Sequence, residues 1–211
     1  KDLSSVMGFI QHGAQVNIPH RDGSRLLHVA AEGNDPDMVK MLVLGAHADI
    51  DQRDNKGFSA LHVASQFGSM QAIKVLVEDC KADIESSDFM HGSRPIHIAT
   101  KYGHKNAVCL LQSLGADVRA KDLEYSWTCL LMAIAEGHSD VLLHLLNYNK
   151  DEQEEELADV DLLEICDNHQ FNAVHVACMM NQPSSLSTLL LLKDSCQQQL
   201  VQDMINSRDS H

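Results

Sequence analysis

Five short segments of the chain resemble one another. They are LLHVAAEGN (26–34), SALHVASQFG (59–68), PIHIATKYG (95–103), CLLMAIAEG (129–137) and AVHVACMMN (173–181). One shared position, held by His or Leu, falls at residues 28, 62, 97, 131 and 175, so successive copies lie 34, 35, 34 and 44 residues apart. Self-similarity at about 30–40 residues is typical of a stacked array, in which each repeat buries its apolar face against its neighbours. The recurrence therefore argues against one or two ordinary globular domains.

Each copy belongs to a longer repeat with the same order of parts. In the second copy, Leu61, Ala64 and Ser65 fall on one helical face. Gly68 is expected to end this helix, because glycine adopts positive φ without a Cβ clash. A second helical segment with an apolar stripe follows. It leads into a stretch of alternating apolar and polar residues, such as GADVRAKD at 115–122, which predicts an extended, hairpin-like arm.

The position that ends the first helix is held by glycine in three copies and by asparagine in two. The glycines are Gly68, Gly103 and Gly137, and the asparagines are Asn34 and Asn181. Asparagine tolerates the left-handed conformation better than most residues other than glycine. We therefore expect positive φ in all five copies.

The turn, the LHxA helix, the glycine, the Leu-rich helix and the GADxx arm together resemble the ankyrin repeat. The pattern of that family includes Thr-Pro-Leu-His-x-Ala at a period of about 33 residues. The resemblance covers all five copies and almost the whole chain. It implies an all-α solenoid of stacked helix–turn–helix repeats with projecting β-hairpin-like arms.

The Thr of the family motif resembles a helix N-cap. Ser59, Thr128 and Asn172 match it with residues that form caps, whereas Arg25 and Arg94 do not. We expect the first helices that follow Arg25 and Arg94 to be less well capped, each by about 1 kcal/mol.

The pattern predicts a single array over residues 1–211. Its parts are a partial repeat (second helix and arm) at 1–22, repeats at 23–56, 57–91 and 92–125, a repeat with an acidic insertion at 126–169, a repeat at 170–204 and the start of a further repeat at 205–211. Both ends are thus incomplete repeats, which predicts that the segment is covalently part of a longer chain.

The acidic insertion is predicted at about 147–161, because the interval from Leu131 to His175 exceeds the family period by about eleven residues. Residues 151–161 hold seven acids and no base, which is half of the formal net charge of −14. Mutual repulsion favours a mobile surface loop, and a docking loop for a Lys/Arg-rich partner is the alternative. The remaining surface is only mildly acidic, which argues against nucleic acid as a partner.

The cysteines and the hydropathy bear on the compartment. Six cysteines at irregular spacings, without a CxxC pair, predict reduced thiols rather than a disulfide framework. No apolar run reaches the roughly 20 residues of a membrane span, so this segment is not expected to insert into a membrane. We expect a cytoplasmic location, or the cytoplasmic face of a larger protein.

Thirteen histidines raise the question of a metal or catalytic site. Four of them hold the same repeat position: His28, His62, His97 and His175. Helices stacked about 8–10 Å apart cannot bring these side chains within the ~2 Å bonds of one metal ion. The resemblance implies instead a structural histidine that hydrogen-bonds neighbouring turns. Because no HExxH, GxSxG or phosphate-binding glycine loop occurs, the sequence predicts no enzyme activity and no catalytic, metal-binding or cofactor-binding residue.

The leading functional hypothesis is a module that binds a protein or peptide partner on a concave groove and the arm tips. A structural spacer or interdomain packing array of a larger protein is the alternative. Scarce aromatic residues mark the predicted partner-binding positions, because five of nine fall at two repeat positions. The predicted set is Phe58, Phe67, Phe89, Tyr102, Tyr125, Trp127 and Phe171, with Phe58, Trp127 and Phe171 expected at the arm tips.

Overall fold

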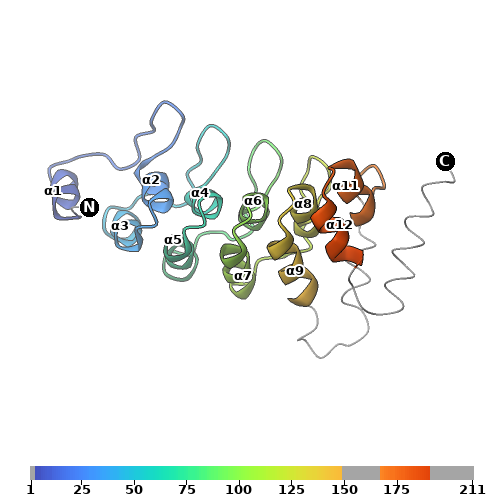
Figure 1. The fold of residues 1–211 in the computed structure, drawn as a ribbon. Coiled ribbons are helices and arrows are strands. Elements are labelled where there is room, and N and C mark those ends of the chain that lie inside the picture. The colour runs from blue at the N-terminus through green and yellow to red at the C-terminus, as the bar shows by residue number, and fades with distance from the viewer. Residues whose placement is uncertain (1–2, 149–166, 191–211) are drawn as a thin grey trace. The chain divides into compact units, whose positions relative to one another are not determined.

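The computed structural model describes residues 3–148 and 167–190 (Figure 1). The chain divides into two compact bodies, an N-terminal body at Lys1–Asp117 and a C-terminal body at Val118–His211, and each is described by itself. The described residues form helices, turns and loops, without a strand, so the predicted all-α class is confirmed. Most of the acidic insertion and all of 205–211 lie outside the described residues.

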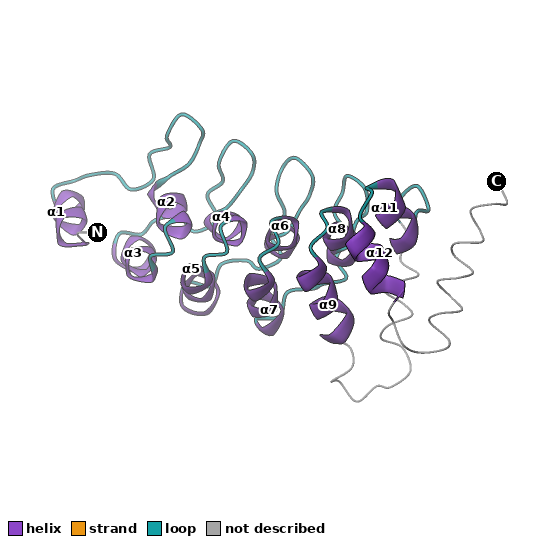
Figure 2. Cartoon of the chain, in the orientation of Figure 1, coloured by secondary structure: helices purple, strands orange, loops and turns teal. Residues whose placement is uncertain are grey.

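The N-terminal body contains three complete helix pairs and one further helix. Its elements are α1 (Leu3–Gln11), α2 (Leu26–Glu32), α3 (Pro36–Lys40), η1 (Met41–Gly45), α4 (Ala60–Gln66), α5 (Met70–Lys74), η2 (Val75–Asp79), α6 (Pro95–Lys101) and α7 (Lys105–Ser113). The π-helical turns η1 and η2 continue α3 and α5 directly. The first helices α2, α4 and α6 pack side by side, and the second helices form a parallel layer (Figures 1 and 2).

The described part of the C-terminal body repeats the arrangement with two pairs. They are α8 (Cys129–Ala135) with α9 (Ser139–Tyr148), and α11 (Ala173–Met179) with α12 (Pro183–Leu190). The first helices α8 and α11 pack together, as do the second helices α9 and α12. Each predicted LHxA segment is thus a first helix of seven residues, too short to be stable alone, so packing between repeats stabilises it.

Small residues let the first helices approach closely. Ala30, Ala64 and Ala99 hold one repeat position in α2, α4 and α6, and all three are buried. The spacing between packed helices depends on the size of the side chains at the contact, so this row of alanines favours a short distance between repeats. Larger side chains, such as Leu61 and Ile96, fill the adjoining core.

The turns between first and second helices have the predicted backbone conformation. Gly68, Gly103 and Gly137 have φ of 63°, 71° and 76°. Asn34 and Asn181 have φ of 48° and 52°, so the expected left-handed asparagines are confirmed. Asn34 has a second role: its Oδ1 accepts hydrogen bonds from the N–H groups of Gln71 and Ala72, at 2.9 and 3.0 Å. Its side chain therefore caps α5 of the next repeat, which glycine could not do.

The predicted helix caps are only partly correct. Asn172 caps α11, since its Oδ1 accepts from the N–H groups of Val174 and His175, both at 3.1 Å. The side-chain cap predicted at Thr128 is wrong, because its hydroxyl accepts no hydrogen bond from its helix. Ser59 forms a capping box with His62, and Ser59 Oγ lies 2.9 Å from Nδ1 of His62.

The deficit of about 1 kcal/mol predicted for Arg25 and Arg94 stays a prediction, and neither side chain caps its helix. The N–H groups of Arg25 and Arg94 donate to the ring Nδ1 of the histidine three residues later, at 3.1 Å in both cases. Ser59 N–H makes the same bond at 3.3 Å. The feature that these three helix starts share is therefore the histidine, which accepts from the N–H group of the residue before the helix.

The arms connect each second helix to the next first helix and project from the row of first helices (Figure 2). They comprise residues 12–25, 46–59 and 80–94 in the N-terminal body, and 118–128 and the described part of the last arm, 167–172, in the C-terminal body. A main-chain hydrogen bond closes each turn, as between Asp54 N–H and Phe58 O at 2.9 Å, and in this arm Gly57 N–H also donates to Asp54 O at 3.0 Å. The hairpin-like shape is thus confined to the turn of each arm.

Candidate protein-binding surface

The first helices and the arms are tied together by the repeated histidine. In α4, Nδ1 of His62 accepts from Ser59 N–H, so Nε2 carries the proton and donates to Ser93 O of the next arm at 3.1 Å. His28 makes the equivalent bond to Phe58 O at 3.0 Å. The predicted structural role is confirmed for both residues. Burial lowers the pKa of His62 from its ordinary 6.5 to about 4, and burial also lowers the pKa of His28, so both rings are neutral at pH 7.

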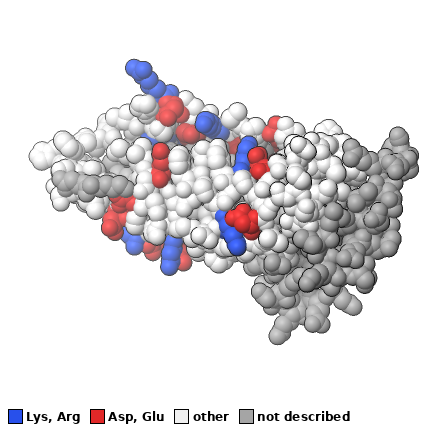
Figure 3. Space-filling model, viewed as in Figure 1, with Lys and Arg blue, Asp and Glu red and all other residues white. Residues whose placement is uncertain are grey.

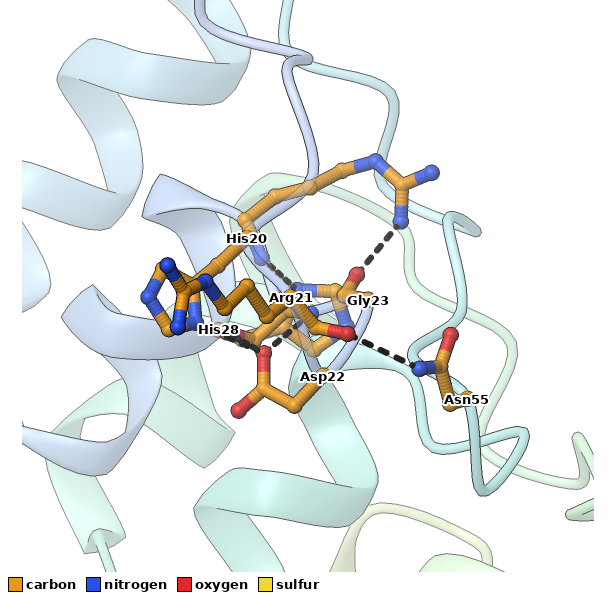
Figure 4. Close-up of polar contacts among 8 residues, drawn as sticks. His20, Arg21, Asp22, Gly23, His28 and Asn55 are labelled. Atoms are coloured by element: carbon orange, nitrogen blue, oxygen red, sulfur yellow. Dashed lines mark hydrogen bonds and ion pairs between the residues drawn. The ribbon is translucent and has the colours of Figure 1, made fainter.

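Neighbouring arms are also bonded directly to one another. Asn55 N–H donates to Asp22 O at 3.0 Å, and Asn55 Nδ2 donates to Arg21 O at 3.2 Å (Figure 4). In the C-terminal body, Asn168 donates in the same way to Tyr125 O at 3.0 Å and to Glu124 O at 3.1 Å. Within each body, adjacent arms therefore form a connected edge rather than independent loops.

An aspartate at the start of each turn stabilises the arms. Asp54 Oδ1 accepts from the N–H groups of Lys56 and Phe58, at 2.9 and 2.8 Å. Asp22, Asp88, Asp122 and Asp167 accept from main-chain N–H groups of their own turns in the same way. The sequence analysis missed this role, although the recurrence of aspartate six to nine residues before the His or Leu position was a visible signal.

Three of the predicted aromatic residues lie at the base of an arm rather than at its tip. Phe58, Trp127 and Phe171 each directly precede the N-cap residue of a first helix, and all three are half-buried. Phe58 stacks on His62 with ring centroids 5.5 Å apart, and Phe171 lies 5.8 Å from His175. Trp127 Nε1 donates to Asp167 Oδ2 at 3.4 Å. These rings therefore have packing partners within the repeat array.

The other four predicted residues are exposed. Phe67 and Tyr102 end α4 and α6 and are 50% and 48% exposed. They hold the same repeat position, and Gln66 Nε2 donates to the Tyr102 hydroxyl at 3.0 Å, which brings the two helix ends together. Phe89 and Tyr125 lie on arms and are 72% and 41% exposed. The structure thus separates the predicted set into three supporting rings and four accessible ones.

Metal-ligand clusters, disulfides and membrane-spanning helices are absent from the described residues. Within 3–148 and 167–190, no group of three or more His, Cys, Asp or Glu side chains could hold a metal ion. No disulfide joins the described cysteines, which are Cys80, Cys109, Cys129 and Cys178. In the same part of the chain, no helix has the length and apolar character needed to span a bilayer. On the face shown in Figure 3, acidic and basic side chains are interspersed.

A family model that describes ankyrin repeats as three copies matches residues 2–88, 27–122 and 96–200. The chain belongs to the ankyrin-repeat family. Ankyrin repeats are generally modules of protein–protein interaction and are typically non-catalytic. No curated protein sequence matches the chain.

Three exposed side chains on these ankyrin arms were not predicted. Ile18, on the arm at 12–25, is 60% exposed. Met90 follows Phe89 and is 64% exposed, and Leu123 precedes Tyr125 by two positions and is 82% exposed. The arms of Met90 and Leu123 thus present an aliphatic or thioether side chain beside an aromatic ring. A search restricted to aromatic residues could not find these side chains. A search for any large apolar residue on the predicted arms could have found them.

Proposed function

We propose that this ankyrin-repeat chain is a non-catalytic module that binds a protein or peptide partner on its first-helix ends and arms. The observation that carries the proposal is the exposed aromatic pair at one repeat position, Phe67 and Tyr102. Large rings that are accessible yet held by their surroundings supply much of the binding energy at protein interfaces.

The same observation favours binding over the alternative of a spacer. A spacer would gain nothing from large apolar side chains that are exposed at repeated positions. Such side chains would only make it more prone to aggregate. Phe67, Phe89, Met90 and Tyr102 are all between about half and three quarters exposed in the N-terminal body alone. A spacer would be favoured if these rings proved dispensable for every interaction of the chain.

The test compares two variants in a pull-down followed by identification of the bound proteins. Phe67→Ala with Tyr102→Ala removes the exposed pair. Leu44→Ala is the matched control, because Leu44 is 58% exposed but lies in η1, in the layer of second helices. We expect the double variant to lose proteins that the control retains, with unchanged melting temperature. Equal recovery by both variants would instead support the spacer.

A further inference from the structure

Phe89 is held in place although, at 72%, it is the most exposed aromatic side chain among the residues whose exposure the structure describes. Its N–H faces Lys56 O of the preceding arm at 3.4 Å. Its ring packs on Gly57, where an added Cβ would lie 2.4 Å from Phe89 Cγ. The guanidinium carbon of Arg53 lies 5.5 Å from the ring centroid, within the range of a cation–π contact. An accessible ring that is already positioned loses little entropy when a partner binds it.

Arg53 is itself fixed by both arms. Its Nη1 donates to Gly57 O at 2.9 Å and to Ser87 O, and these bonds fix the guanidinium beside Phe89. No carboxylate of the described residues forms an ion pair with Arg53, whereas Arg94 pairs with Glu85. Arg53 therefore keeps a charge that is not neutralised by a described neighbour.

Two further cations near the turns of these arms also lack an ion pair with a carboxylate of the described residues. They are Arg21 and Lys56, and both are exposed. The aspartates of the same turns are directed to their own main chains: Asp54 and Asp88 accept from N–H groups of their turns. This part of a chain with a net charge of −14 thus offers cations around apolar side chains.

We propose that Phe89, Met90, Arg21, Arg53 and Lys56 form a docking patch, the arm patch, for an acidic polypeptide segment that carries an apolar side chain. This inference rests on the proposed function and specifies the partner. The apolar side chain would contact Phe89 and Met90, and the carboxylates would pair with the three cations, of which Arg53 also positions the ring. The phosphates of a nucleic acid could pair with the cations, but they would make no apolar contact with Phe89 and Met90.

The test measures fluorescence anisotropy of labelled peptides on the intact chain. The probe is Glu-Asp-Leu-Phe-Glu-Asp; one comparison peptide replaces every acid by Lys, and another replaces Leu and Phe by Ser. We expect both comparison peptides to bind at least about tenfold more weakly, and binding of the probe to weaken as salt is added. Equal binding of the Lys peptide, or tighter binding of an oligothymidine, would overturn the proposal.

Variants of the chain test the two central residues. Phe89→Ala and Arg53→Ala should each lower affinity for the probe at least about fivefold. The affinity of Arg53→Lys for the probe should lie between that of the unchanged chain and that of Arg53→Ala, because lysine keeps the charge but loses the planar group that stacks on the ring. Arg53→Lys also keeps the test valid if Arg53→Ala misfolds. Lys74→Ala is the control of equal charge change, since Lys74 lies in α5 and pairs there with Glu78.

The two proposals fail in different ways. If proteins recovered in the pull-down are lost with Phe67→Ala and Tyr102→Ala but retained with Phe89→Ala and Arg53→Ala, the proposed function stands and the arm patch is wrong. If Phe89→Ala and Arg53→Ala lose the acidic probe while the control retains it, the arm patch is supported directly.

Discussion

The side chain of His62 and the main chain of Ser93 are joined by a hydrogen bond of 3.1 Å between adjacent repeats. His62 is fully buried, and its other ring nitrogen is occupied by Ser59 N–H, so the ring functions only in its neutral form. A proton on Nδ1 would break the bond to Ser59 and place a charge in the core. The contact between the repeats is therefore sensitive to pH.

We predict that the protein loses stability as the pH falls from about 6.5 to about 4. The pKa of His62 is about 4 in the folded state and near its ordinary 6.5 when unfolded, so the unfolded state binds the proton first. The stabilisation from this histidine is complete above pH 6.5 and is lost through that window, by about 3 kcal/mol in total. The lowered pKa of His28 adds a change of the same sign. Urea denaturation at several pH values measures the effect.

His62→Leu is the control for this pH dependence. Leu131 holds the same repeat position fully buried, so leucine is compatible with the site. The variant should be less stable at pH 7, by about 1–3 kcal/mol, because Ser93 O loses its donor, and its stability should vary less between pH 6.5 and 4. An unchanged pH profile in this variant would assign the dependence to other groups.

Gly57→Ala should destabilise the protein more than Gly115→Ala. Both glycines have positive φ, of 83° and 98°, so alanine strains each backbone by about 1–2 kcal/mol. A Cβ at Gly57 would also lie 2.3 Å from Phe89 N, whereas nothing lies within 4 Å of one at Gly115. We expect an additional cost of about 1–3 kcal/mol at Gly57, measured by denaturant unfolding. Equal costs would show that the Phe89 arm moves aside freely.

Leu111→Ala and Leu110→Ala should lower the free energy of unfolding by different amounts, although the two residues are adjacent in α7. Leu111 is fully buried and Leu110 is half-buried, although both are leucines of the same second helix. Leu111→Ala leaves a cavity and should cost about 2–5 kcal/mol, as should Leu61→Ala. Leu110→Ala should cost about 1 kcal/mol. A larger loss at Leu110 than at Leu111, in the same unfolding assay, would contradict the orientation of α7.

Asn34→Gly should destabilise the protein even though glycine is the residue of this position in three other repeats. Glycine keeps the positive φ but removes the oxygen that accepts from Gln71 and Ala72 N–H. We expect a loss of about 1 kcal/mol, the usual value of a helix cap. Calorimetric melting of the two proteins measures it, and a gain in stability would mean that the cap contributes nothing.

The sequence predicted the repeats and the turns because these depend on local residue types. The LHxA segments, the second helices and the left-handed positions at Gly68 and Asn34 all follow from periodicity and from the conformational range of single residues. The exposure of the aromatic rings did not follow in the same way. Phe58 and Phe89 both lie on arms, yet one is covered by His62 and the other is open, because exposure depends on which neighbouring side chain reaches the ring.

The hydrogen bonds that join adjacent repeats also bear on how the chain folds. The bonds made by His28, His62 and His104 to the neighbouring repeat close chain segments of 30, 31 and 38 residues. Because each contact needs only the next repeat, the entropy of loop closure stays constant however many repeats are stacked. Folding can therefore begin at one helix pair and spread to its neighbours, and its rate depends on the stability of that first pair more than on the length of the chain.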